Sequence, residues 1–136
     1  MRPPARVATY LLDTSVIIDA LNDKRGRRDF LLGLVKRGHL PACCPINITE
    51  VYAGLRAKEE AATEEFLRSL EYYHLTWPVA RLAGLLRRDY RRKGTTITVA
   101  DATVAAVALV HELTLMTGNV KDFPMRELAL YPLPVS

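Results

Sequence analysis

The sequence predicts an α/β fold in which a short, mainly parallel sheet lies between two layers of helices. Two observations favour this class. Short apolar runs rich in strand-forming residues alternate along the chain with helical patterns. Neighbouring parallel strands need a crossover connection, and a helix is the usual one. With 136 residues, 49% of them hydrophobic and 25% charged, the chain is expected to form one globular domain over residues 1–136.

The first half of the chain contains two strand–turn–helix units. Residues 7–12 predict a strand that ends at Asp13-Thr14-Ser15, a polar turn suited to starting a helix. Residues 40–46 predict a second strand, after which Asn47 is expected to begin a helix. A charged helical stretch, residues 59–70, follows.

The second half repeats the alternation. Pro78 predicts the start of an amphipathic helix that Gly94 ends. Residues 98–113 are apolar almost all round, which is typical of a helix packed on more than one side. Residues 115–117 then predict a buried strand, and residues 128–133 a last short one.

Charge and cysteine usage narrow the class of protein. The net charge of +4 favours an anionic partner such as nucleic acid. Cys43 and Cys44 are adjacent, so a disulfide between them would be strained, and we expect two small buried side chains in a reducing cytosol. The N-terminal Met1-Arg2-Pro3-Pro4 leads into an apolar stretch too short for a signal peptide or membrane span. A cytoplasmic protein is expected.

Four acids stand where parallel strands end or helices begin. Asp13 ends the first strand, Glu50 and Asp101 lie in the first turns of two helices, and Asp122 follows residues 115–117. The carboxyl ends of parallel strands meet at one edge of a sheet, where sites form. Carboxylates gathered there repel one another unless a cation neutralises them, and oxygen ligands suit Mg²⁺ or Mn²⁺. Such a site is typical of phosphate chemistry.

Three of these acids also fit helix capping, in which a carboxylate three residues past the cap satisfies backbone donors. The patterns are Asn47-x-x-Glu50, Thr98-x-x-Asp101 and Asn119-x-x-Asp122. Asp101 shares its helical stripe with the apolar Val104, Ala105 and Ala108, so its carboxylate is expected to face the packed side. Capping alone does not require that direction.

Four segments together resemble the signature blocks of a PIN domain, in the same order. They are YLLDTSVIID at 10–19, ITEVYAG at 48–54, VADA at 99–102 and MTGNVKDF at 116–123. The resemblance spans nearly the whole chain, and the short length is most similar to the VapC-type toxins of toxin–antitoxin pairs.

The resemblance implies a three-layer α/β/α sandwich that acts as a Mg²⁺- or Mn²⁺-dependent endoribonuclease, the toxin of a type II toxin–antitoxin pair. It implies Asp13 and Asp101 as the principal metal ligands. Glu50 would be a metal or metal-water ligand and the candidate water activator, and Asp122 the fourth acid. The supporting hydrogen-bonding residues would be Thr14, Ser15, Thr117 and Asn119.

The same resemblance implies RNA as substrate, a homodimer, and a cognate antitoxin that inserts a basic side chain into the acidic pocket. Many relatives carry Arg where this chain has Gly118, so a phosphate contact is expected to be missing at that position.

Other functions stay open at this stage. A PIN-like fold can serve as a non-catalytic interaction module or as an RNA-processing nuclease without a toxin role, although the intact acids favour a nuclease. A receiver domain or an aspartate-dependent phosphatase needs acids paired on the first strand, where only Asp13 stands. A flap nuclease needs helical arches that this length cannot hold.

The basic runs at 24–28 and 87–93 either hold an RNA backbone or are solvated helix faces. Tyr90 could stack on a base, whereas Tyr72, Tyr73 and Trp77 are expected in the core or in a dimer contact. Asp19 falls on the helical face of Ser15 and Val16 and is either a solvated helix charge or a residue with an active role; it is not included in the expected site.

Overall fold

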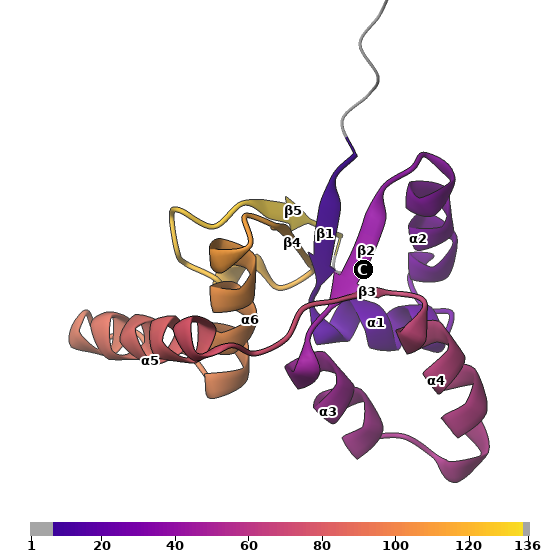
Figure 1. The fold of residues 1–136 in the computed structure, drawn as a ribbon, viewed down its shortest axis with the longest axis horizontal. Helices are drawn as coiled ribbons and strands as arrows, with labels where there is room; N and C mark the ends of the chain where they lie inside the picture. Colours follow the sequence, from indigo (N-terminus) through magenta and orange to yellow (C-terminus); the bar gives the residue numbers. More distant parts are fainter. Residues whose placement is uncertain (1–6, 135–136) are drawn as a thin grey trace, which may run out of the picture.

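The structure, a computed structural model, describes residues 7–134. Met1 to Pro4, on which the expectation about a signal peptide depends, lie outside the described residues. Five strands form one parallel sheet in the order β3-β2-β1-β4-β5 (Figure 1). The strands are β1 (Thr9–Leu12), β2 (Leu40–Cys43), β3 (Glu71–Tyr72), β4 (Thr114–Thr117) and β5 (Leu130–Pro132).

Helices cover both faces of this sheet. They are α1 (Thr14–Leu21), α2 (Arg27–Lys36), α3 (Pro45–Ala53), α4 (Glu60–Arg68), α5 (Trp77–Arg92) and α6 (Val99–Val110), with two 3₁₀ turns, η1 (Ala57–Glu59) and η2 (Val120–Asp122). In Figure 1, α5 and α6 lie on one side of the sheet, and α1, α2 and α4 on the other. Between residues 7 and 134, no helix is long and apolar enough to cross a membrane.

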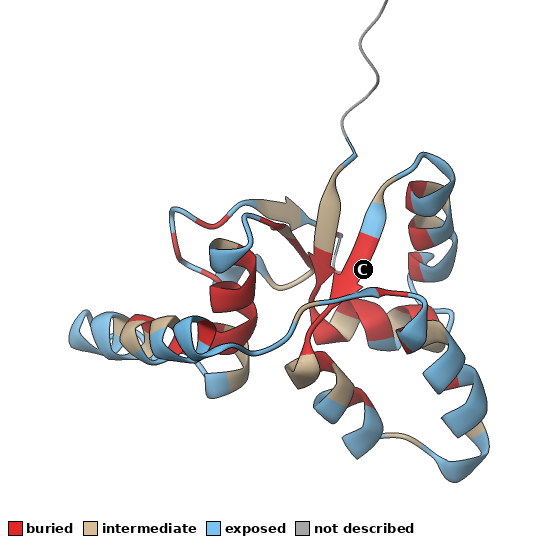
Figure 2. Cartoon of the chain, in the orientation of Figure 1, coloured by how far each residue is buried: buried red, intermediate tan, exposed pale blue. Residues whose placement is uncertain are grey.

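The central strands are buried on both faces, as Figure 2 shows, because their side chains alternate between two apolar clusters. Leu11, Ala42 and Leu115 pack against α5 and α6. Their neighbours Leu12, Cys43 and Met116 pack against α1, α2 and α4. This period of two confirms the predicted three-layer α/β/α sandwich.

Helix α3 begins two residues earlier than the sequence pattern predicts. Pro45 occupies its first turn, where the missing N–H of proline costs nothing, and Cys44 is the cap residue. The side chain of Asn47 accepts a hydrogen bond from the Cys44 amide at 2.8 Å and closes that first turn. The expectation that Asn47 starts the helix is therefore wrong, and Glu50 lies one turn further along.

The aromatic residues near β3 divide into two groups. Tyr73 packs against the cluster beneath α5 and α6, as expected. Tyr72 and Trp77 do not fill the core: Tyr72 is exposed, and Trp77, the first residue of α5, is 77% exposed. Tyr72 stands at the sheet edge, where the two-residue strand β3 leaves little surface to pack against.

Cys43 and Cys44 are free thiols that are buried completely, which confirms the expectation of small core residues. Burial, together with the neighbouring Cys44, raises the pKa of Cys43 to about 11. Burial also raises the pKa of Cys44. Since the folded pKa of Cys43 exceeds its ordinary value of 9.0, the contribution of its protonated thiol to stability is present below pH 9 and is lost toward pH 11.

We expect both thiols to react with DTNB at pH 8 at least about a hundredfold more slowly in the native protein than in denaturant, because burial reduces both access and the thiolate fraction. The rate of absorbance change measures this. Cys43→Ala identifies which thiol contributes. Rapid modification of either cysteine in the native protein would contradict the buried placement.

Candidate active site

The site lies where the order of the strands reverses within the parallel sheet: β2 and β3 lie on one side of β1, and β4 and β5 on the other. Strands β1 and β4 are neighbours, yet β1 leads into α1 on one face, whereas β4 is reached from α6 on the other. The loops after these two strands diverge, and a crevice forms at such a point. The Asp13 amide donates to the carbonyl of Met116 at 2.9 Å and ties the two loops together.

Asp13 follows β1 directly and is only 9% exposed. It stands at the cap position of α1 but makes no side-chain capping bond. Instead, its Oδ2 accepts a hydrogen bond from Thr117 Oγ1 at 2.7 Å. Burial raises the pKa of Asp13; hydrogen bonds from Thr117 and the Thr14 amide oppose this, and the charges of Glu50 and Asp122 add to it.

Glu50 projects from α3 at an exposed position and is oriented by a relay of hydrogen bonds. Thr14 Oγ1 donates to Glu50 Oε1 at 2.7 Å and accepts from Asn47 Nδ2 at 3.0 Å. Asn47 is fully buried and also donates to the carbonyl of Leu12 at 3.2 Å. A hydroxyl has one proton, so the amide of Asn47 directs that proton onto Glu50.

The same arrangement occurs at Thr117. Its Oγ1 accepts from the Asn119 amide at 2.9 Å, which leaves its proton for Asp13. Ser15 Oγ lies 3.5 Å from Asp13 Oδ2 and accepts from Asn119 Nδ2, also at 3.5 Å. The four predicted supporting residues therefore all contact an acid or a neighbour of one.

Asp101 is both a cap-associated residue and a member of the acidic group. Its amide donates to Thr98 Oγ1 at 3.0 Å, as the capping pattern predicts. Its half-buried carboxyl has a raised pKa: burial is the largest cause, the bond to Thr98 opposes it, and the charges of Asp13, Asp122 and Glu50 add to it. Capping alone would not bring Asp101 within the field of these three acids.

Asp122 lies at the end of η2 and is exposed. The predicted capping box is wrong here: the segment is a single 3₁₀ turn, and Asn119 makes no side-chain capping bond. Asp122 donates its amide to the Asn119 carbonyl at 3.0 Å. Its charge raises the pKa values of both Asp13 and Asp101, so the structure places all four acids in one electrostatic cluster.

The chemistry of this cluster suits a hard divalent cation. Over residues 7–134, no three His, Cys, Asp or Glu side chains are positioned to hold a metal ion as they stand. Mg²⁺ does not need three, because it keeps several waters and binds through one or two carboxylates. The donors are all oxygen, and a cation would offset the mutual repulsion that raises two of the pKa values. The residues present therefore fit Mg²⁺ or Mn²⁺.

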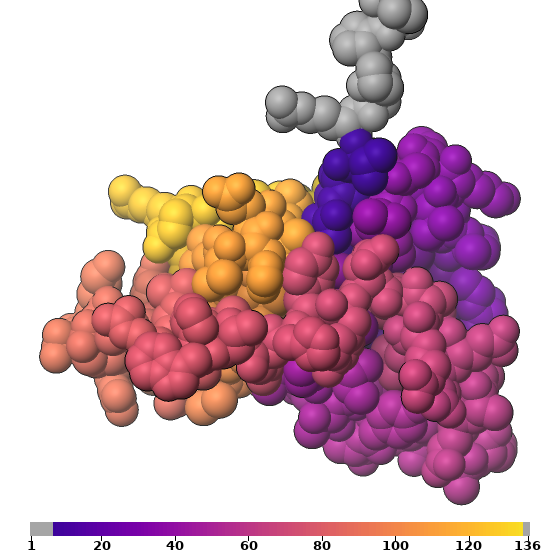
Figure 3. Space-filling model, viewed as in Figure 1, coloured from indigo at the N-terminus to yellow at the C-terminus, as the bar shows by residue number. Residues whose placement is uncertain are grey.

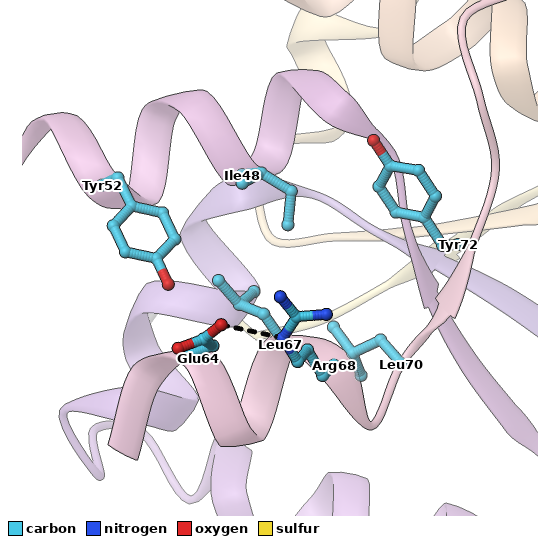
Figure 4. A pocket seen from close by; sticks show the side chains of 7 residues that line it. All are labelled: Ile48, Tyr52, Glu64, Leu67, Arg68, Leu70 and Tyr72. Atoms are coloured by element: carbon cyan, nitrogen blue, oxygen red, sulfur yellow. Dashed lines mark hydrogen bonds and ion pairs between the residues drawn. The ribbon is translucent and has the colours of Figure 1, made fainter. Parts of the chain in front are cut away.

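A hollow of about 500 Å³ lies between α3 and α4, and none of the four acids lines it. Figure 4 shows the side chains that line it, which are Ile48, Tyr52, Glu64, Leu67, Arg68, Leu70 and Tyr72. Glu64 is paired with Arg68 at 2.8 Å, and none of the four clustered acids takes part. This hollow is not the site of the metal chemistry.

A smaller hollow of about 150 Å³ borders the acids, and we call it the Arg27 hollow. Its lining residues are Ser15, Val16, Asp19, Arg25, Arg27, Gly118 and Asn119. Asp19 is not the solvated helix charge that the sequence allows, because it lies 3.1 Å from Arg25 Nη1 and 3.8 Å from Arg27 Nε.

Sequence reasoning missed two residues of the site, Asn47 and Arg27. Asn47 was interpreted as a helix start, although an amide between Ile46 and Ile48 is a signal for a buried hydrogen-bonding role. Arg27 was grouped with a basic run, yet it is only 6% exposed.

Comparisons with known proteins agree with the fold. The profile of the PIN domain family matches residues 10–125. Ribonuclease VapC19 of Mycobacterium tuberculosis is 34% identical over 115 residues, which cover 85% of this chain and 92% of that protein.

Two solved structures are also similar. VapBC2 from Rickettsia felis, bound to a DNA fragment from its promoter, aligns with a TM-score of 0.79 and 26% identity over 92% of this chain and 98% of the other. A toxin–antitoxin complex from Klebsiella pneumoniae aligns with a TM-score of 0.71 and 26% identity over 91% and 99%.

We expect Asp13→Asn to raise the unfolding temperature of the metal-free protein by several degrees at pH 7. A raised folded pKa means that protonation stabilises the fold: the contribution is complete below pH 3.8 and is lost as the pH rises through the raised value. The neutral amide removes that penalty and can still accept from Thr117. Thermal unfolding in EDTA from pH 4 to 7 measures the gain, which should shrink toward pH 4.

Asp23→Asn is the matched control, because Asp23 is exposed and has a positive φ of 53° that asparagine also tolerates. Added Mg²⁺ should stabilise the wild type more than Asp13→Asn. Equal unfolding temperatures of the wild type and Asp13→Asn in EDTA at pH 7 would rule out a destabilising charge at Asp13.

Proposed function

The chain belongs to the PIN domain family, and on that premise we propose that it is a metal-dependent endoribonuclease, the toxin of a type II toxin–antitoxin pair. The observation that carries this proposal is the cluster of Asp13, Glu50, Asp101 and Asp122 beyond the carboxyl ends of β1 and β4. Buried and mutually repelling carboxylates weaken the fold, so their presence favours a catalytic site over a non-catalytic module.

Asp13 and Asp101, the two acids with raised pKa values, are the residues that would hold Mg²⁺ or Mn²⁺. The bound ion would activate a water and stabilise the negative charge that develops on the phosphate. Thr117 holds Asp13 Oδ2 in a fixed direction through a 2.7 Å bond, which limits the reorganisation needed during the reaction.

Glu50 is the group that would accept the proton of the attacking water. It is exposed toward substrate, and the hydroxyl of Thr14 occupies its Oε1, which leaves the other carboxylate oxygen for the water. Asp122, also exposed, adds negative charge at the rim and supports water or metal ligation there.

The basic face of α5 supports RNA as substrate. Arg88, Arg91 and Arg92 are exposed on its C-terminal half, which forms one end of the face seen in Figure 3. Arg87 Nε donates to the Ile97 carbonyl at 2.7 Å, beside the cap of the helix that carries Asp101. Tyr90 is half-buried, and its hydroxyl donates to the Pro124 carbonyl at 3.3 Å; base stacking on its ring stays a prediction.

We further propose a cytoplasmic homodimer, one domain per chain, controlled by a cognate antitoxin that places a basic side chain among the acids. The buried, unpaired thiols suit a reducing compartment. The similar VapBC2 and Klebsiella pneumoniae structures support an antitoxin partner.

We expect Asp101→Asn to reduce Mg²⁺-dependent cleavage of RNA at least about a hundredfold, because the variant loses a charged ligand with little change in shape. Cleavage of a mixed RNA pool by purified protein, read by sequencing the fragment ends, measures the loss. Asp23→Asn should cleave as the wild type does. If Asp101→Asn stayed fully active, or if EDTA had no effect, this mechanism would be excluded.

We expect the wild-type chain to arrest growth when expressed alone, and Asp101→Asn at the same protein level to be harmless. Co-expression of the cognate antitoxin should restore growth. Cleavage of RNA in vitro without any growth defect would favour the alternative of an RNA-processing nuclease. Growth arrest that the antitoxin leaves unchanged would argue against the proposed pair.

A further inference from the structure

Arg27 lines the hollow beside the acids and has hydrogen-bonding capacity that the described residues do not use. It is 6% exposed, and within the described part of the chain its Nε has no hydrogen-bond partner. One Nη2 proton goes to the carbonyl of Pro134. The 3.8 Å separation between Nε and Asp19 Oδ2 is too long for a hydrogen bond. A buried guanidinium with an unused donor is costly unless a ligand supplies the acceptor.

The lining of the Arg27 hollow suits an anion. Asp19 is the acidic residue among its lining residues, and at 3.8 Å from Arg27 Nε it is too far away to accept a hydrogen bond from that nitrogen. Of the remaining polar lining, Asn119 has a second side-chain N–H that can donate to an oxygen anion, whereas the single proton of Ser15 goes to Asp13.

The hollow adjoins the acid cluster directly. Ser15 and Asn119 line it, and Ser15 Oγ also lies 3.5 Å from Asp13 Oδ2. An anionic group in the hollow would therefore lie beside a group held at Asp13. A polymer with one phosphate per residue can occupy both places at once.

We propose that the Arg27 hollow binds the RNA phosphate next to the scissile one, with Arg27 as the residue that determines its position. This inference rests on the proposed ribonuclease function and adds a substrate-positioning residue to it.

Gly118 also lines the Arg27 hollow, so substitutions at this position can test the hollow without changing Arg27. A Cβ at Gly118 would lie 3.5 Å from Arg27 Nη2, an ordinary van der Waals contact. The phosphate contact that the sequence suggests is missing at Gly118 is thus supplied by Arg27 from α2. Position 118 lines the hollow, so a side chain introduced there begins beside Arg27.

A purely structural role for Arg27, holding Pro134 and Asp19 in place, is the competing explanation. Arg27→Gln tests both roles, and Arg28→Gln is its matched control. Arg28 lies next to it on the same helix but is exposed, pairs with Asp23 at 3.7 Å and does not line the hollow.

Binding of a short single-stranded RNA is measured in an Asp101→Asn background, between about 50 and 300 mM KCl. Arg27→Gln should weaken binding roughly tenfold and lower the slope of log K against log salt by about 0.7, the value for one phosphate on a single strand. In the active enzyme it should raise KM with little change in kcat. Arg28→Gln should leave the slope unchanged.

Gly118→Glu and Gly118→Gln, made in the otherwise wild-type chain, keep the test decisive even if Arg27→Gln fails to fold. Gly118→Glu places a carboxylate beside Arg27 and should weaken RNA binding, whereas the neutral Gly118→Gln should not. Gly118→Arg in the Arg27→Gln background should restore binding, which the structural role does not predict.

The outcomes separate the two proposals. If the wild type cleaves RNA but Arg27→Gln and Gly118→Glu keep its KM and salt slope, the phosphate site is refuted and the ribonuclease stands. Loss of binding in folded Arg27→Gln without rescue by Gly118→Arg also refutes it. A wild type that cleaves no RNA overturns both.

Discussion

The burial of one carboxylate between two parallel strands is the constraint on which the site depends. Asp13 sits where β1 and β4 end side by side, with its amide bonded to the Met116 carbonyl and its side chain held by Thr117. That position lets the helices on both faces contribute residues: α3 brings Glu50 and α6 brings Asp101. This arrangement costs stability, because burial and the neighbouring negative charges both disfavour the ionised forms of Asp13 and Asp101, and a divalent cation would offset that cost.

Neutral side chains do most of the orienting. Two threonine hydroxyls, at positions 14 and 117, each accept one hydrogen bond from an asparagine and pass their own proton to an acid. The direction of each acid is therefore set by a residue that carries no charge. Ser15 and Asn119 also line the Arg27 hollow, so the positively charged Arg27 lies near the negatively charged acid cluster. A phosphate bound through a cation at the acids, and a neighbouring phosphate bound to Arg27, would each meet a positive charge on such a surface.

Sequence patterns predicted the order of strands and helices well because burial on two faces leaves long apolar runs in β1, β2, β4 and α6. They were less accurate where one short sequence pattern is compatible with two different local structures. Asn47 has the features of a helix start but is a buried linker in the third helical position. The pattern at Asn119 and Asp122 resembles a capping box but forms a single 3₁₀ turn. Trp77 is apolar yet exposed, since only tertiary packing decides which aromatic residues find a neighbour.

The sequence by itself determined the alternation of strands and helices, the parallel sheet, and the four acids, because strand ends and helix starts are local properties of the chain. Only the tertiary structure decided what connects those acids. The Asn47–Thr14–Glu50 relay joins α3 to α1, and Arg27 reaches Gly118 and Pro134 from a helix about a hundred residues earlier. Contacts of that kind depend on how two faces of a sheet bring distant loops together, and no local periodicity records them.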